Sequence, residues 1–179
     1  MANTNSPNGF TPAYHMSGGT IRPSEFAIAS GTNASIFTGD VVNLSSGLVI
    51  QGTATGAPLG VFAGVEYQAT DGSVVFSNMW TADTATLGSA NAKAYVYADP
   101  DIVYEAQATA TPTQATIGTT NTISTTAGST STGRSAEGVT ATTSSGIATV
   151  VGFVDRPDNS IGQYARMYVI FPTSAFGNN

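Results

Sequence analysis

Short runs of apolar and β-branched residues, separated by turn residues, recur along this chain from Ser24 to Phe171. Runs that predict strands span residues 25–30, 35–37, 40–44, 48–51, 59–68, 73–80, 92–98, 101–107, 147–155 and 163–171. Between two of them, Asp71-Gly72 is a strong signal for a hairpin turn. Helical periodicity is limited to a turn or two near residues 83–91. Many short strands at a spacing of about 8–12 residues predict an all-β fold, either a β-sandwich or a barrel.

Alternation in the last run predicts which side chains are buried. One face of this run is apolar and reads as a core row: Ala165, Met167, Val169 and Phe171. The opposite face is amphipathic: Tyr164, Arg166, Tyr168 and Ile170. Tyrosine and arginine are enriched at protein interface hot spots, so this second face is a candidate interface. The alternative, that tyrosines merely cover a half-exposed sheet, stays open.

The first 20 residues are rich in Asn, Gly and Pro and show neither the helical nor the strand period, which predicts an extended N-terminal arm. Its large apolar side chains Phe10, Tyr14 and Met16 are candidates for docking on another subunit. We therefore expect an arm over residues 1–20, a single β domain over 21–172 and a C-terminal tail over 173–179.

Residues 106–146 are nearly all Thr, Ala, Ser and Gly. Such bias often indicates disorder, but threonine is a good strand former and some alternation persists. We expect a long, partly ordered surface hairpin or loop within the β domain, with residues 124–135 as its most mobile part.

Charge is scarce: 9% of the 179 residues are charged, compared with about a quarter in ordinary domains. A weakly charged surface promotes association, so this composition favours a protein that packs against other proteins. The net charge of −6 and a pI near 4.3 argue against binding nucleic acid, which needs clustered basic residues. The sequence shows neither a leader nor a membrane span, so we expect no membrane contact and synthesis in the cytoplasm.

Candidate chemistry is sparse. His15 lies in the expected arm without a nucleophile motif, and no cysteine is present for disulfides or thiolate metal sites. Asp99 and Asp101 flank a proline at a spacing that could contribute to a calcium site, but a turn with solvated carboxylates fits better. Asp155 and Asp158 bracket Arg156, which predicts a turn with an exposed ion pair. We therefore expect no catalytic residue, cofactor or metal.

Five stretches carry a resemblance to a known family: MANTNSPNGFTPAYHMSGGTIRPSEFAIASG, IFTGDVVNL, LGVFAGVEY, AYVYADPDIVYEAQA and VGFVDRPDN. They resemble small virion proteins of tailed bacteriophages, the group that decorates or cements the capsid. The resemblance implies a jelly-roll-like body on the outer capsid surface of a virion, synthesised in the host cytoplasm. It also implies a homotrimer that bridges neighbouring subunits of the major capsid protein. No site residues carry over from the family.

Two other classes remain open. A glycan-binding adhesin module on a virion or cell surface is compatible with an all-β fold rich in Thr, Ser and Asn. A carboxylate-dependent hydrolase would need two facing carboxyls, for which Glu66 and Glu105 are the available groups. A tail or neck protein of the virion is a close relative of the cement hypothesis.

Overall fold

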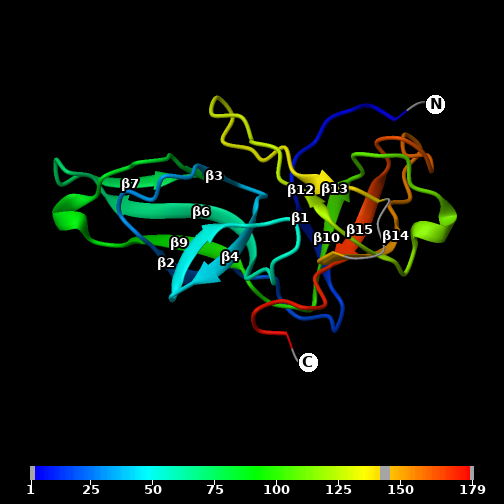
Figure 1. The fold of residues 1–179 in the computed structure, drawn as a ribbon, viewed down its shortest axis with the longest axis horizontal. Coiled ribbons are helices and arrows are strands. Elements are labelled where there is room, and N and C mark those ends of the chain that lie inside the picture. Colours follow the sequence, from blue (N-terminus) through cyan, green and yellow to red (C-terminus); the bar gives the residue numbers. More distant parts are fainter. Residues whose placement is uncertain (1–2, 142–145, 178–179) are drawn as a thin grey trace.

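A computed structural model describes residues 3–141 and 146–177 as an elongated all-β molecule with two lobes (Figure 1). Each lobe surrounds its own hydrophobic cluster. Residues 24–98 form one lobe, which we call the barrel lobe. The residues before and after this range together form the other, which we call the second lobe. Val41 and Val61 belong to barrel strands but pack into the second cluster, so the two cores are continuous at the junction.

The barrel lobe contains eight strands: β2 (Ser24–Ile28), β3 (Ile36–Phe37), β4 (Val41–Ser45), β5 (Leu48–Gln51), β6 (Gly60–Gln68), β7 (Val74–Ser77), β8 (Met79–Trp80) and β9 (Ala92–Tyr97). The strand order β4-β5-β2-β9-β6 closes into a five-stranded barrel because β6 also pairs with β4. Trp80 and Phe62 are fully buried inside it. β3 and β8 form a separate two-stranded ladder, and β7 continues β6 as a hairpin.

The second lobe contains β1 (Thr11–His15), β10 (Ile102–Gln107), β11 (Thr120–Asn121), β12 (Ile123–Ser124), β13 (Gly138–Val139), β14 (Ala148–Phe153) and β15 (Arg166–Ile170). Five of them form an antiparallel sheet in the order β1-β10-β15-β14-β11. β12 and β13 form a short additional ladder. In the core of this lobe the ring of Phe171 packs against the rings of Phe10 and Tyr104. The ring centroid of each lies 5.4 Å from that of Phe171.

The expectation of an all-β fold, either a sandwich or a barrel, is confirmed by the five-stranded barrel. The jelly-roll topology that the resemblance implied is not confirmed. The Asp71-Gly72 hairpin is confirmed as the β6–β7 connection, in which Gly72 adopts a φ of 88°. The expected helix near residues 83–91 is only the 3-10 turn η1 (Leu87–Ser89). The last strand begins three residues later than expected, because Tyr164 adopts a φ of 61° and bends the chain.

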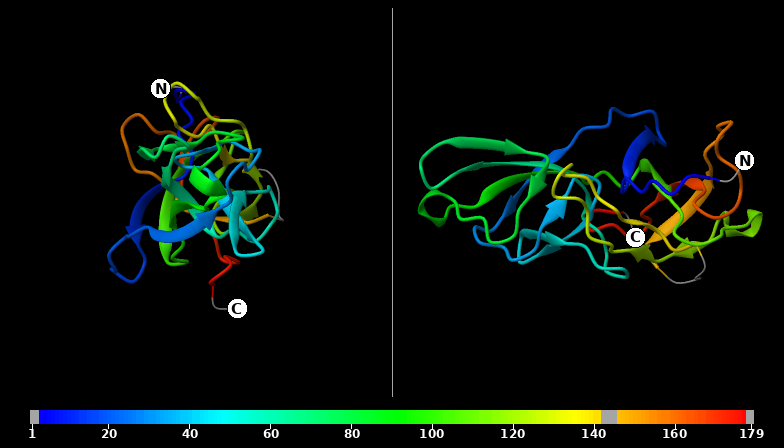
Figure 2. Two further views of the ribbon diagram at one scale, coloured as in Figure 1. Left: turned by 90° about the vertical axis from the view of Figure 1, so that its left-hand side faces the viewer. Right: turned by 90° about the horizontal axis from the view of Figure 1, so that it is seen from above.

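The extended arm is not confirmed. Residues 11–15 form β1, the edge strand of the five-stranded sheet, and residues 3–16 lie along the second lobe of their own chain (Figure 2). Phe10 is 1% exposed because it fills the core of that lobe. The structure does not describe residues 1–2 and 178–179, at the outer ends of the expected arm and tail.

The Thr-rich block contributes to the core as well as to the surface. Ile123 and Val139 are buried in the second cluster, although they are surrounded in sequence by small polar residues. The 3-10 turn η2 (Gln114–Thr116) and strands β11 to β13 lie within the block. Threonine hydroxyls of Thr120 and Thr149 pair across strands at 3.0 Å. Residues 142–145 of this block lie outside the described part.

Candidate interaction surface

The outer face of the five-stranded sheet gathers several of the predicted interface residues. The alternation expected for the last strand is confirmed, since Met167 and Val169 are buried while Arg166 and Tyr168 lie on the opposite face. The register places Tyr168 opposite Glu105 of β10. Tyr14 of β1 meets Tyr168 edge to face, with ring centroids 5.5 Å apart. We call Tyr14, Glu105, Arg156, Arg166 and Tyr168 the outer sheet face.

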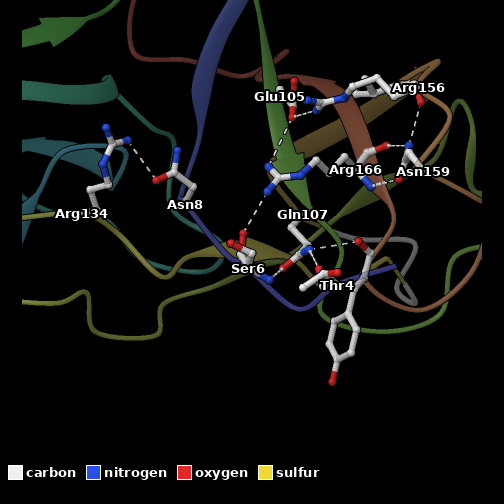
Figure 3. A network of polar contacts seen from close by, with 11 residues as sticks. Thr4, Ser6, Asn8, Glu105, Gln107, Arg134, Arg156, Asn159 and Arg166 are labelled. Carbon is white, nitrogen blue, oxygen red and sulfur yellow. Dashed lines mark hydrogen bonds and ion pairs between the residues drawn. The ribbon is translucent and has the colours of Figure 1, made fainter. Parts of the chain in front are cut away.

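A network of charges is centred on Glu105 (Figure 3), which lies opposite Tyr168 in the strand register. Arg166 donates to Glu105 Oε1 at 3.3 Å and to the carbonyl oxygen of Ser6 at 3.0 Å. Arg156 donates to the same carboxylate oxygen of Glu105. The ion pair expected between Arg156 and its neighbouring aspartates is replaced by this one across the sheet. Two guanidinium groups share one carboxylate, so the network carries a net positive charge in an otherwise acidic chain.

The N-terminal segment is bound to this network through its backbone. Gln107 donates to the carbonyl oxygen of Thr4 at 2.8 Å and accepts the Ser6 N–H at 3.0 Å. Further along, Arg134 donates to Asn8 Oδ1 at 3.0 Å. Figure 3 shows these contacts side by side along the same segment. In the structure, the segment therefore packs on its own chain, whereas the sequence predicted docking on another subunit.

Asn159 is a structural residue that the sequence analysis overlooked. Its side-chain amide donates to the carbonyl oxygens of Val154 and Arg166, and its Oδ1 accepts the Arg166 N–H at 2.8 Å (Figure 3). These bonds close the loop between β14 and β15 and fix where β15 begins. Asparagine in a Pro- and Gly-containing segment signals a turn, but such a signal does not reveal which strands the side chain joins.

The six candidate interface residues fall into four places. Tyr14, Arg166 and Tyr168 come together on the outer sheet face. Met16 is exposed beside a hollow of about 300 Å³ that Pro172 and Phe176 also line. Tyr164 is half-buried beside a polar hollow of about 240 Å³, and Phe10 is buried in the core.

His15 combines with Asp99 and Ser17 in an arrangement that superficially resembles a catalytic triad. Its Nε2 lies 3.0 Å from Asp99 Oδ2, and its Nδ1 lies 3.1 Å from Ser17 Oγ. However, Nδ1 also accepts the backbone N–H groups of Ser17 and Gly19. That nitrogen has one lone pair, which these N–H groups already occupy, so it is poorly placed to take a serine proton. We assign His15 a structural role in closing the turn after β1.

Asp99 and Asp101 lie with His15 in a cluster whose ligand atoms are within 4.8 Å of one another. The N–H of Asp101 and, to a smaller extent, His15 lower the pKa of Asp99. The Asp101 N–H donates to Asp99 Oδ1 at 2.9 Å, which is the geometry of a turn stabilised by its aspartate. These bonds engage both carboxylate oxygens of Asp99 and both ring nitrogens of His15 within the turn.

Two carboxyl groups are buried where the lobes meet. Glu137, 1% exposed, accepts the Val41 N–H at 2.8 Å through Oε2, while its Oε1 has no hydrogen-bond partner among the described residues. Burial, reinforced by the nearby charge of Asp40, raises the pKa of Glu137 to about 9. Burial also raises the pKa of Asp40, although the Phe37 N–H and the Ser135 hydroxyl oppose this shift. At neutral pH Glu137 is therefore protonated in the folded protein.

No family model, no curated protein and no solved structure matches this chain. Over the described residues, every helical segment is too short and too polar to span a bilayer.

Proposed function

We propose that this protein is a virion structural protein that binds the outer surface of an icosahedral phage capsid and cements neighbouring major capsid subunits. The observation that carries the proposal is the outer sheet face, where the exposed Tyr14 and the half-buried Tyr168 border a positively charged network on a chain that is otherwise poor in charge. Tyrosine and arginine are the residue types that most often dominate binding energy. Such a face suits a permanent contact with another protein.

The proposal includes a homotrimer and no enzymatic activity, cofactor or metal. A protein that binds only the expanded shell stabilises it by mass action, so a mechanical role needs no catalytic group. Tyr14 and Met16, which are 43% and 58% exposed, are the N-terminal side chains available for contact with the shell. Phe10 is buried and has no place in that contact.

The test is binding of purified protein to mature phage heads stripped of accessory proteins, imaged by cryo-electron microscopy. We expect ordered density on the outer surface at local threefold positions. Absence of bound density on every stripped head would overturn the cement proposal.

The double variant Tyr14→Ser/Tyr168→Ser should weaken binding to the shell by at least about 30-fold, since a hot-spot residue contributes about 2 kcal/mol or more. The matched control is Ile50→Ser/Leu87→Ser, which removes two exposed apolar side chains of the barrel lobe. Shell occupancy would be measured by co-sedimentation, with thermal unfolding of each variant as a check on folding. Equal losses in both variants would contradict a role for the outer sheet face.

A second candidate, a glycan-binding adhesin, is favoured by the polar hollow of about 240 Å³ in the second lobe. Its lining is Asn3, Thr4, Ser6, Gln107, Asp158, Asn159, Tyr164 and Arg166. Amides, hydroxyls and an aromatic ring suit a sugar, but Gln107 and Asn159 already use their amides in internal bonds. We therefore rank this candidate second, and binding on a glycan array with loss in Tyr164→Ala would reverse the order.

A further inference from the structure

β7 is an open edge strand at the end of the barrel remote from the five-stranded sheet (Figures 1 and 2). Among the described strands it pairs only with β6. Val74 and Phe76 lie on one face of β7 and are 59% and 72% exposed. The strand VVFS contains no charge and no proline, the devices by which natural edge strands avoid pairing with other chains.

The ladder with β6 shows which backbone groups of β7 are free. Ala69 donates its N–H to Ser73 O at 2.8 Å, so these two residues are a hydrogen-bonded pair. In an antiparallel ladder hydrogen-bonded and non-hydrogen-bonded pairs alternate. With the observed register, Val75 is hydrogen-bonded to Tyr67, whereas Val74 and Phe76 are in non-hydrogen-bonded pairs. The N–H and C=O groups of Val74 and Phe76 therefore point away from β6, toward the open edge.

We propose that β7 pairs antiparallel with β7 of a second copy of this chain, about a twofold axis at Val75. In that register Val74 of one copy is opposite Phe76 of the other. Both such pairs exchange their backbone hydrogen bonds, so every outward-pointing group of Val74 and Phe76 finds a partner. The same pairing places each valine against a phenylalanine, and aromatic contacts with β-branched residues are favourable cross-strand pairs.

Charge does not oppose this arrangement. Asp71, the acidic residue in the turn before β7, would lie about 27 Å from its copy across the axis, since eight positions along a strand separate them. That distance exceeds the Debye length of about 10 Å at 0.1 M salt. Glu66 of β6 accepts a hydrogen bond from Tyr95 and pairs in register with Lys93, which offsets its charge.

The contact is small, so the dimer is weak in dilute solution. Four residues per copy bury less area than the roughly 1,200 Å² of a standard interface. A high local concentration, as on a regular array, would favour it strongly. The pairing involves the barrel lobe alone and leaves the outer sheet face free. The pairing and the proposed function can therefore be tested, and can fail, independently.

A register-specific cross-link tests the proposal. In the proposed dimer Val75 faces its own copy as a non-hydrogen-bonded pair, with Cα atoms about 4.5 Å apart, a distance that a disulfide can span. The Cα atoms of Val74 and its copy would be about 9 Å apart, which is too far. The natural chain has no cysteine, so each variant carries a single thiol. Under mild oxidation Val75→Cys should form disulfide dimers at least tenfold faster than Val74→Cys.

Sedimentation velocity over a concentration series provides the second measurement, on the natural chain. The average sedimentation coefficient should rise with concentration, and Val74→Lys/Phe76→Lys should abolish that rise. The control Ile117→Lys/Ile161→Lys adds the same charge at two exposed apolar positions of the second lobe and should leave it intact. A sedimentation coefficient that stays constant over the concentration series, together with equal cross-linking of Val75→Cys and Val74→Cys, would overturn the proposal. So would a concentration-dependent rise that the lysine pair in β7 leaves unchanged, whether the rise starts from a monomer or from the proposed homotrimer.

Discussion

Replacing Glu137 by glutamine should make the protein more stable at neutral and alkaline pH and remove much of the pH dependence of its stability. The folded protein holds a proton on Glu137 up to about pH 9, whereas the unfolded chain releases it near the ordinary value of 4.5. Between these values the folded state binds more protons, so its stability falls as pH rises, by roughly 1.4 kcal/mol for each pH unit. Below pH 4.5 the contribution is fully present, and above pH 9 it is lost.

The uncharged amide of Glu137→Gln offers one acceptor oxygen and a hydrogen-bond donor, as the protonated carboxyl group does. It keeps an oxygen to accept the Val41 N–H and adds a donor next to the carboxylate of Asp40, whose charge contributes to the raised pKa of Glu137. The two proteins should have similar free energies of unfolding at pH 4.5 and diverge by several kcal/mol at pH 8. Burial also raises the pKa of Asp40, so a smaller slope of the same sign should remain in the variant.

Urea unfolding between pH 4.5 and pH 9 measures this difference. Glu25→Gln, which removes one exposed carboxyl from β2, is the matched control for net charge and should leave the slope unchanged. Parallel curves for Glu137→Gln and the natural protein would show that Glu137 is ionised in the folded state, contrary to its burial and its unpartnered oxygen.

Local patterns in the sequence predict the strands well, because strand formation and turn chemistry depend on neighbouring residues. The run at residues 48–51 coincides with β5, and Asp71-Gly72 marks the hairpin between β6 and β7. Closure of the barrel depends instead on the β4–β6 and β2–β5 pairings, which join segments that sequence alternation does not relate. An alternating strand predicts which of its faces is buried, but not which other strand will cover that face.

The candidate site likewise combines residues that local alternation predicts with residues that only contacts between distant segments bring together. Alternation places Arg166 and Tyr168 on the polar side of their strand, and the structure agrees. It could not predict that Tyr14 would join them, because residues 1–20 show no period from which β1 could be inferred. Nor could it predict the burial of Glu137, which lies in a stretch of small polar residues typical of surface loops. Both placements result from long-range packing of the second lobe.

Replacing Phe10 by alanine should destabilise the protein by about 3–5 kcal/mol, the usual cost of truncating a buried phenylalanine. The ring packs 5.4 Å from that of Phe171, and the segment that carries it is also held by the Phe10 N–H bond to Gly39 of the barrel lobe. Tyr14→Ala is the control, four residues away on the same segment. It removes an exposed ring and its contact with Tyr168, which should cost only about 1 kcal/mol.

Fluorescence of Trp80 makes this comparison more informative, because the single tryptophan is buried in the barrel and not in the lobe that contains Phe10. Val41 and Val61 belong to the barrel strands yet pack in the cluster around Phe10, so we expect the lobes to unfold together. The Trp80 transition of Phe10→Ala should therefore shift to lower denaturant along with the far-UV signal. Unchanged unfolding would mean that Phe10 leaves its own core and that residues 1–20 act as a free arm. A shift in both signals means that the segment belongs to the fold, so that the proposed contact with other subunits would fall to Met16 and the outer sheet face.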